Sequence, residues 1–322
     1  MKPLGYFFAC SILALACLPV AAIAADNQQT PEKPEKTRLQ CWVDLYRGEP
    51  VSYHAVLGDL AGVRVVYLGE SHGLTRHHEI QERIVTDLAK RGVPLVLALE
   101  QMEAIYQTPL DLYVLGTIDF EELAQMTDWK NRWSGYENYR GVLEAARKAD
   151  APILALNARR ETIRQVARSG GVDRLDPELR KELPEEIQLD DPPYEHLLNL
   201  RLAVHKMATP ERLRPMLEAQ IARDETMASA LSKFLQSEQG RGRTAIVLCG
   251  GVHCSHGLAT VDRVRRRMPG VTDRIILMSA SGDAKVTKSM QAVTRPITIT
   301  HEQLRKVERP VADYLHVISR KQ

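Results

Sequence analysis

Residues 64–99 read RVVYLGESHGLTRHHEIQERIVTDLAKRGVPLVLAL, and this stretch decides the fold. The run at 64–68 is short and apolar and ends at a glycine, which predicts a buried strand. Residues 75–90 repeat apolar side chains at helical spacing and end at an Arg-Gly-Val-Pro turn, which predicts a helix. The run LVLAL at 95–99 predicts a second buried strand. A strand, a helix and a strand in this order form a βαβ unit, so the two strands should be parallel.

The alternation of strands and helices continues along the chain. Further strands are predicted at 152–156, 244–248 and 275–278, with late edge strands at 297–299 and 314–318. Helices are predicted at 138–148, 159–168, 209–236 and 258–268. Residues 172–208 hold several short helical segments, which we interpret as a helical insertion. The pattern predicts an α/β fold: a mostly parallel sheet with helices on both faces and a smaller helical subdomain.

The N-terminal residues predict export. Residues 1–24 combine one lysine, an apolar stretch and an Ala-Ile-Ala cleavage site, the features of a secretory signal peptide. We therefore expect a periplasmic protein, or one associated with a membrane from the periplasmic side. Outer-membrane association would require a lipid anchor on Cys17, although the lipobox before it is poor. Residues 25–45 are polar and contain proline, so they predict a linker before a folded domain at 46–320.

Composition and cysteine content narrow the class of protein. The chain has 322 residues and a formal net charge of +2, which gives no electrostatic reason to expect nucleic acid as a partner. Cys41, Cys249 and Cys254 follow the signal peptide, and an odd number of cysteines argues against a fold built on disulfides. Cys249 and Cys254 are expected either to pair after export or to remain buried thiols.

Polar side chains follow four of the predicted strands. Glu70 and His72 come after the first strand and Glu100 after the second. Asn157 comes after the third strand, and His253 follows the strand at 244–248. Because the carboxyl ends of parallel strands gather ligands, we expect these side chains to meet at one edge of the sheet. Carboxylate and imidazole groups serve as acid/base catalysts or as metal ligands, and this pattern leaves both chemistries open.

Two helices add polar side chains to this predicted site. His77, His78 and Gln81 lie in the first turns of the helix at 75–90, where free backbone amides favour an anion. In the helix at 209–236, Gln220 and Asp224 fall within an apolar stripe. A buried carboxylate needs a partner because its charge is costly in an apolar environment. A histidine, an arginine or a metal ion at the sheet edge would meet that need.

Five ordered segments resemble one protein family. They are LGESHGLTRHHEIQ (68–81), LALEQM (97–102), GYENYRGVLEAARKADAPILALNARR (135–160), EAQIARDETMA (218–228) and IVLCGGVH (246–253). These segments resemble the ChaN family of exported bacterial proteins linked to haem binding and iron uptake. That family shares a superfamily with the Tiki metalloproteases and the erythromycin esterases. The resemblance implies an α/β domain with a helical subdomain, haem held in a pocket between them, and a homodimer.

The resemblance also implies which residues form the site. The family motifs match Gly69, Glu70, His72, His77, His78, Gln81, Glu100, Asn157, Gln220, Asp224, Gly250 and His253. Haem ligation in the family involves a tyrosine, but no motif identifies that tyrosine in this chain. Tyr136, Tyr139 and Tyr194 are the candidates.

Two functions are therefore predicted. The first is a haem-binding protein for haem or iron uptake. The second is a metal-dependent hydrolase, an esterase or a peptidase. It would bind a divalent metal through His72, Glu100 and His253, with Glu70 or His253 as the general base. The resemblance favours haem binding, whereas the chemistry of the Glu/His residues alone favours the hydrolase.

Overall fold

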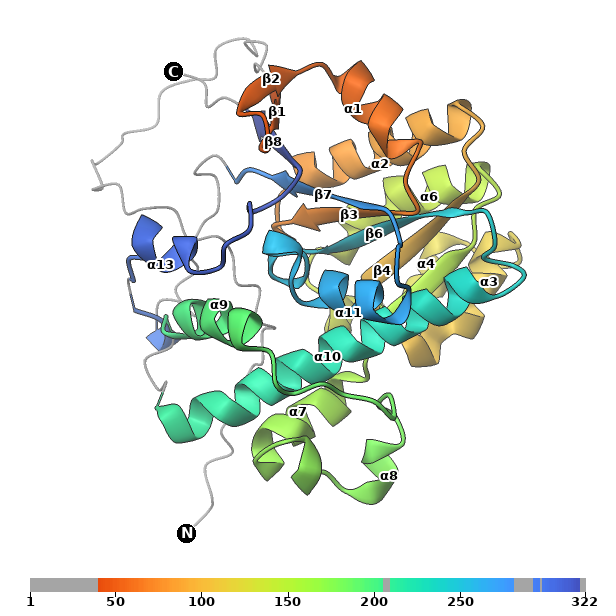
Figure 1. The fold of residues 1–322 in the computed structure, drawn as a ribbon. Coiled ribbons are helices and arrows are strands. Elements are labelled where there is room, and N and C mark those ends of the chain that lie inside the picture. The colour runs from red at the N-terminus through yellow and green to blue at the C-terminus, as the bar shows by residue number, and fades with distance from the viewer. Residues whose placement is uncertain (1–39, 205–208, 281–291, 296, 319–322) are drawn as a thin grey trace, which may run out of the picture.

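A single sheet of eight strands organises the described residues, which are 40–204, 209–280, 292–295 and 297–318 of this computed structural model (Figure 1). The strands are β1 (Gln40–Asp44), β2 (Glu49–Val51), β3 (Val65–Glu70), β4 (Leu95–Glu103), β5 (Ile153–Asn157), β6 (Thr244–Gly250), β7 (Asp273–Met278) and β8 (Tyr314–Ile318). Their order across the sheet is β2-β1-β8-β7-β3-β6-β4-β5. The strands from β8 to β5 are parallel to one another, and β1 runs antiparallel to both β2 and β8.

The predicted βαβ unit is confirmed as β3, α2 (Thr75–Lys90) and β4. Its two strands are parallel but not adjacent, because β6 lies between them and pairs with both. The strand that carries the Gly-Gly-Val-His segment is thus central to the sheet. Every residue of β3, β4 and β6 is buried, which explains why these strands are continuous apolar runs rather than alternating ones.

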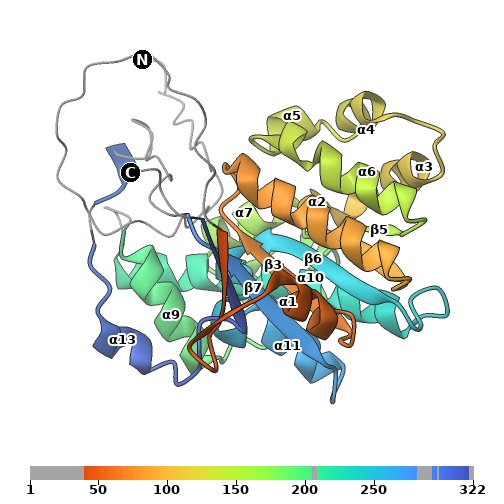
Figure 2. The ribbon, with the colours of Figure 1, turned by 90° about the horizontal axis from the view of Figure 1, so that it is seen from above.

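Helices cover both faces of the sheet, as predicted (Figures 1 and 2). Val66 and Leu68 point to the face packed by α1 (Tyr53–Leu60), α2 and α6 (Arg140–Lys148). Val65 and Tyr67 point to the opposite face, where α10 (Pro210–Gln236) and α11 (Thr260–Arg267) pack. Alternate residues of one strand thus enter two separate hydrophobic cores.

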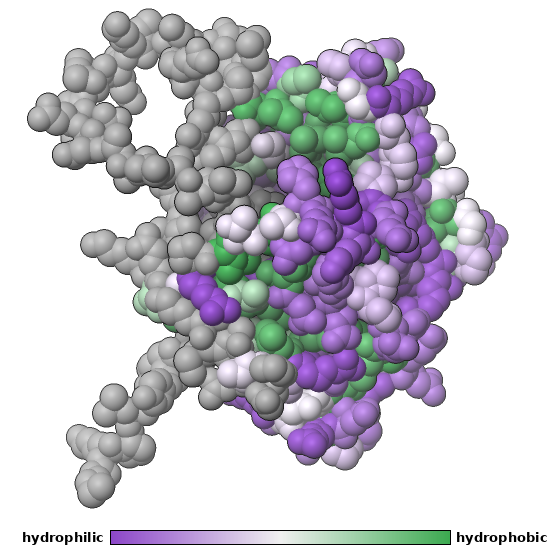
Figure 3. Space-filling model, turned by 60° about the vertical axis from the view of Figure 1, so that its left-hand side comes forward, coloured by the Kyte–Doolittle hydropathy of each residue, from purple (hydrophilic) through white to green (hydrophobic). Residues whose placement is uncertain are grey.

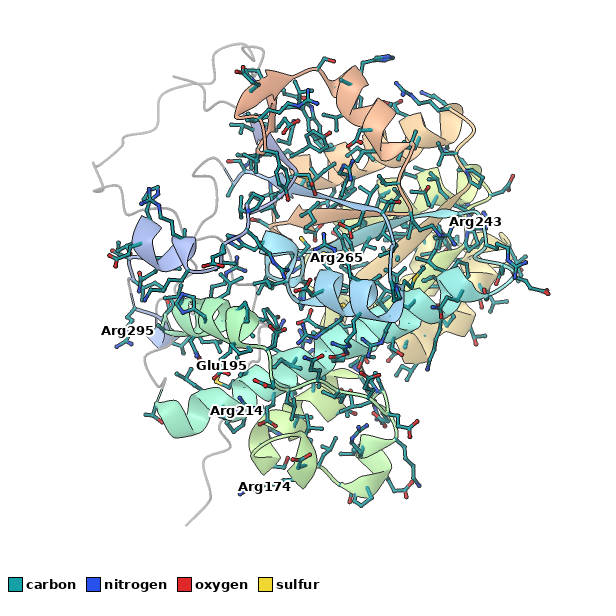
Figure 4. All side chains as sticks on the ribbon, viewed as in Figure 1. Arg174, Glu195, Arg214, Arg243, Arg265 and Arg295 are labelled. Atoms are coloured by element: carbon teal, nitrogen blue, oxygen red, sulfur yellow. The ribbon has the colours of Figure 1, made fainter. Side chains whose placement is uncertain are left out.

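A smaller helical subdomain packs against α10. It comprises α7 (Arg160–Ser169), the 3₁₀ turn η3 (Val172–Arg174), α8 (Pro177–Arg180) and α9 (Pro192–Leu202). Leucines of α9 pack against Leu217 and Ile221 of α10. Glu195 of α9 and Arg214 of α10, both labelled in Figure 4, form an ion pair at 3.4 Å. Residues 205–208 of the predicted insertion lie outside the described residues.

Between β4 and α6, where the sequence pattern predicts no element before residue 138, the chain forms short helices. These are η1 (Ala104–Tyr106), α3 (Gln107–Val114), α4 (Phe120–Met126), α5 (Trp129–Arg132) and η2 (Tyr136–Tyr139). Helix α4 begins with a capping box between Asp119 and Glu122. This segment brings the buried aromatic side chains of Trp129, Trp133 and Tyr139 over the carboxyl end of β4.

Three sequence predictions need correction. Residues 40–44, assigned to the linker, form β1, which is held in place by pairing with the distant β8. The segment 314–318 is a strand but not an edge strand, because β1 and β2 extend the sheet beyond it. Residues 297–299 form no strand; they lead into α13 (His301–Arg305), which Thr300 and Gln303 cap.

The face drawn in Figure 3 is mostly hydrophilic, with hydrophobic side chains gathered toward its upper edge. In the described part of the chain, no helix combines the length and the apolar character needed to cross a membrane. Cys41 is an exposed thiol, and Cys249 and Cys254 are buried free thiols. The predicted signal peptide at 1–24 and Cys17 lie outside the described residues.

Candidate functional site

The predicted polar edge forms where β3, β6, β4 and β5 end side by side. The pairing register sets Glu70 opposite Gly250, and Leu99 opposite Leu248. The register between β4 and β5 shifts after Leu99, so that Glu103 rather than Gln101 lies opposite Asn157. Because the strands are parallel, four distant segments deliver their carboxyl ends to one place.

Glu70 is the centre of one half of the site. Its buried carboxylate accepts hydrogen bonds from the Gln81 amide, the Tyr139 hydroxyl and the Gln101 amide, the last at 3.2 Å. Nδ1 of His72 lies 2.6 Å from the same carboxylate. Burial alone would raise the pKa of Glu70, but the hydrogen bond and charge of His72 outweigh burial and lower it. Glu70 is therefore an anchored anion.

His72 is the part of this site that reaches solvent, with 13% of its side chain exposed against 1% or less for Glu70, Glu100 and His253. Its ring lies edge-on to Trp133 at a centroid distance of 4.8 Å. Burial lowers the pKa of His72, but the hydrogen bond to Glu70 and the charge of Glu100 more than compensate and raise it. Its Nε2 lies 4.0 Å from Glu100.

Glu100, His253 and Asp224 form the other half as a buried line of charges. Nε2 of His253 lies 3.1 Å from Glu100, and Nδ1 lies 2.6 Å from Asp224. Burial opposes both charges. The two carboxylates nevertheless raise the pKa of His253 to about 10, and the His253 charge lowers the pKa of Glu100 to about 2.

Asp224 on α10 is a buried carboxylate, and the sequence left its partner open between a histidine, an arginine and a metal ion. In the structure that partner is His253. Asp224 also accepts hydrogen bonds from the hydroxyls of Thr260 at 2.7 Å and Tyr194 at 2.5 Å. The amide nitrogen of Gln220, one turn earlier, lies 3.3 Å from both ring nitrogens of His253. Helix α10 thus holds His253 from the side opposite Glu100.

Two glycines make room for this packing. A Cβ at position 250 would lie 2.9 Å from Nε2 of His72, and the Gly250 amide donates to Glu100 at 2.6 Å. A Cβ at position 69 would overlap the side chain of Leu277 and lie 2.7 Å from the sulfur of Cys254. Glycine is required at both positions for close approach rather than for a special backbone angle.

His77, His78 and Gln81 are buried beneath the edge rather than exposed at it. Nδ1 of His77 accepts from the Ser71 amide and Nε2 donates to the Ser279 carbonyl, so its ring is a neutral tautomer. Burial lowers the pKa of His77 to about 4. The nitrogens of His78 face the His72 carbonyl at 3.0 Å and Gln81 at 3.1 Å. These three residues tie the loop after β3 to α2.

The three candidate tyrosines differ in accessibility. Tyr139 and Tyr194 are completely buried and donate their hydroxyls to Glu70 and Asp224. Tyr136 is partly exposed and stacks on Phe120 at a centroid distance of 6.1 Å. Of the three, Tyr136 can therefore meet a ligand without leaving its position.

Asn157 and Gln101 complete the site. The Asn157 amide nitrogen donates to the Glu100 carbonyl at 2.7 Å, which joins the ends of β5 and β4. Gln101, which donates to Glu70, was not singled out from the sequence. The sequence feature that could have indicated Gln101 is its position next to Glu100. Neighbours on a strand normally point to opposite faces of the sheet, however, so this position did not predict a contact with the site.

The predicted metal ligands His72, Glu100 and His253 do lie together, at the distances given above. Their contacts with one another are ion pairs. Across the described ranges, no group of three or more His, Cys, Asp and Glu side chains is arranged to hold a metal ion. A metal at this site stays a prediction.

Comparison with known proteins adds the family. The sequence model of the family described as "Haem-binding uptake, Tiki superfamily, ChaN" matches residues 56–264. The chain belongs to the ChaN family. Its matched region runs from α1 into α11 and contains every candidate site residue named above. A search of curated proteins finds no match.

Solved structures with the same fold include one titled as cofacial haem binding to ChaN of Campylobacter jejuni. It has a TM-score of 0.64 and 18% identity, and the alignment covers 87% of this chain and 97% of that one. At this identity the likeness supports the fold alone. The type III effector HopBA1 matches with a TM-score of 0.43 and 12% identity, and the alignment covers 74% of this chain and 88% of the effector chain. A mutant of the erythromycin esterase EreC, in its open conformation, matches with a TM-score of 0.42 and 13% identity. That alignment covers 74% of this chain and 76% of the esterase chain.

Proposed function

We propose that this member of the ChaN family is an exported haem-binding protein that serves haem or iron uptake. The observation that carries the proposal is the family match over residues 56–264. The signal-peptide features of residues 1–24 support export. Export is consistent with an uptake role, because haem and iron enter a bacterial cell from outside the cytoplasm. The haem-bound ChaN of Campylobacter jejuni, whose fold this chain shares, supports haem as the ligand.

In this proposal the edge of a haem would lie against η2. Haem requires an axial donor, apolar surface for its ring, and cations for its propionates. Tyr136 would supply the donor oxygen, because it is the accessible candidate tyrosine. Phe120, on which it stacks, would supply apolar surface. Arg140, whose guanidinium lies 4.2 Å from the Phe120 ring centroid and pairs with Glu121, would supply a cation. Bound haem would contribute the iron that this oxygen coordinates.

A haemin titration of the purified chain tests the proposal. We expect a shifted Soret band that saturates near one haem per chain. Tyr136→Phe should weaken binding and change the spectrum, because it removes the donor oxygen. Tyr46→Phe is the matched control, since Tyr46 is 71% exposed and lies on the β1–β2 turn. A wild-type spectrum identical to free haemin would overturn haem binding, whereas an unaffected Tyr136→Phe variant would overturn only the ligand assignment.

Export, anchoring and assembly need separate measurements. Cell fractionation with mass spectrometry of the mature chain distinguishes cleavage after Ala24 from a lipidated Cys17. We propose the first, with a homodimer as the assembled form. Light scattering of the haem-loaded and haem-free protein measures the oligomeric state. A chain that keeps residues 1–24 and stays in the cytoplasm would refute the uptake role.

A further inference from the structure

Two buried thiols, Cys249 and Cys254, lie on either side of the turn that carries His253. Cys249 is the last residue but one of β6, and Cys254 directly follows the 3₁₀ turn η4 (Gly251–His253). Both belong to the hydrophobic core packed by α10 and α11, and they are 1% and 0% exposed. The structure holds them as free thiols.

The register of the sheet brings the two sulfurs together. Gly69 of β3 lies opposite Cys249 of β6, and paired residues of neighbouring strands lie on the same face about 4.8 Å apart. A Cβ at position 69 would lie 2.7 Å from the sulfur of Cys254, so this sulfur fills the space over Gly69, next to Cys249. A hydrogen bond with Cys254, together with burial, raises the pKa of the Cys249 thiol. The two thiols are thus in contact, at a separation that a disulfide can span.

Cys41 cannot replace either partner. It is exposed on β1, which lies four positions from β6 in the order of strands. Four strand spacings amount to about 19 Å, whereas the Cα atoms of a disulfide lie at most about 7 Å apart. Among the cysteines of the described residues, Cys249 and Cys254 are therefore the pair that can form a bond.

We propose that Cys249 and Cys254 form an intramolecular disulfide when the chain folds in an oxidising compartment, and that this bond fixes the turn that holds His253. The compartment rests on the export proposed above, because disulfides persist outside the reducing cytoplasm. One cysteine thiolate attacks the disulfide of a thiol–disulfide oxidant and forms a mixed disulfide, and the other thiolate then displaces the oxidant. Two protons and two electrons pass to the oxidant, which leaves as two thiols. Because both cysteines are buried in the folded chain, this exchange takes place before the core closes.

The bond would close a covalent ring over residues 249–254, which includes two groups of the polar site. The Gly250 amide donates to Glu100 at 2.6 Å, and His253 lies between Glu100 and Asp224. Closing the ring restricts the unfolded chain, which stabilises the folded one. The disulfide therefore supports the buried line of charges from the core side of β6.

Peptide mapping of the full chain tests the pairing, because trypsin releases residues 244–263 as one peptide that contains both cysteines. The purified chain is unfolded and reduced, refolded with reduced and oxidised glutathione, and alkylated with iodoacetamide in urea before digestion. We expect this peptide to carry no alkyl group and to be lighter by two hydrogen atoms than the dithiol form. Reduction before alkylation should give two alkyl groups. Two alkyl groups without that reduction, or a glutathione adduct on this peptide, would overturn the pairing, whether or not cells export the chain.

Urea denaturation measures what the bond contributes. Reducing the oxidised chain should lower its unfolding midpoint by about 1 M urea. Cys254→Ala should have the lower midpoint and no response to the reductant, and the matched control Cys41→Ala should respond as the wild type does. A wild-type midpoint that the reductant leaves unchanged would refute the stabilising role, even if a variant fails to fold.

The pairing and haem binding have separate readouts. A chain that forms the disulfide but leaves the haemin spectrum unchanged would refute haem binding alone. A chain that binds haemin while peptide 244–263 stays a dithiol would refute the disulfide alone.

Discussion

Asp224→Asn probes the buried line of charges at its inner end. Asp224 is fully buried and accepts from His253, Thr260 and Tyr194. Asparagine has nearly the same shape, so the change removes the charge without creating a cavity. It also leaves at least one of the hydroxyl donors facing an amide N–H instead of an oxygen.

The expected loss of stability follows from the pKa of His253. Its rise from 6.5 to about 10 corresponds to about 5 kcal/mol at about 1.36 kcal/mol per pKa unit. Glu100 and Asp224 share this effect, so losing Asp224 should remove about 2 kcal/mol. The mispaired hydroxyl should lower the free energy of unfolding by about a further 1–2 kcal/mol. The free energy of unfolding should therefore fall by about 3–4 kcal/mol below neutral pH.

This difference should depend on pH. Because the folded-state pKa of His253 lies above its unfolded value, its contribution is complete below about pH 6.5 and disappears as pH rises through about 10. In the variant the folded-state pKa of His253 is lower, so protonation of His253 contributes less to the free energy of unfolding and less of it disappears as pH rises. Between about pH 6 and about pH 10 the difference between wild type and variant should shrink to about 1–2 kcal/mol.

Urea denaturation followed by circular dichroism at several pH values measures this difference. Asp190→Asn is the control, because Asp190 is exposed and its side chain makes none of the contacts described for Asp224. A difference that is small at low pH, or that stays constant across the range, would refute the reasoning that the His253–Asp224 charge pair stabilises the folded chain.

Three further changes test the packing around the site, each by denaturation. Gly69→Ala should cost about 1–3 kcal/mol because its Cβ would overlap the side chains of Leu277 and Cys254. Glu225→Gln should cost about 3–5 kcal/mol because it removes the buried carboxylate that Arg263, Arg266 and Arg267 share. Tyr139→Phe should cost about 1.5–3 kcal/mol because it removes a hydrogen bond to the Glu70 carboxylate.

Each of these changes has its own contradicting result. Gly73→Ala is the control for the glycine, since a Cβ there meets nothing within 4 Å, and equal stability of the two alanine variants would contradict the packing argument. A loss below about 1 kcal/mol for Glu225→Gln would mean that the arginines find other partners. A Tyr139→Phe variant as stable as the wild type would show that Glu70 is satisfied without the hydroxyl.

The sequence by itself determined the class of fold and the edge where the site forms. Long apolar runs such as 95–99, separated by helical periodicity, require a buried parallel sheet with helices on both faces. Parallel strands deliver their carboxyl ends to one edge, so the convergence of Glu70, Glu100 and His253 followed from their positions after strands. These properties are local, because each depends on a few neighbouring residues.

Only the tertiary structure decided the partners. The placement of β6 between β3 and β4, the pairing of β1 with β8, and the choice of His253 for Asp224 all join residues far apart in the chain. The short strand at 40–44 carries too little local signal to be distinguished from a linker, since its partner lies more than 250 residues away. The burial of Tyr139 and Tyr194, against an accessible Tyr136, likewise depends on which helices pack over the edge. Such pairings are set by the packing of whole elements, and spacing along the chain carries no record of them.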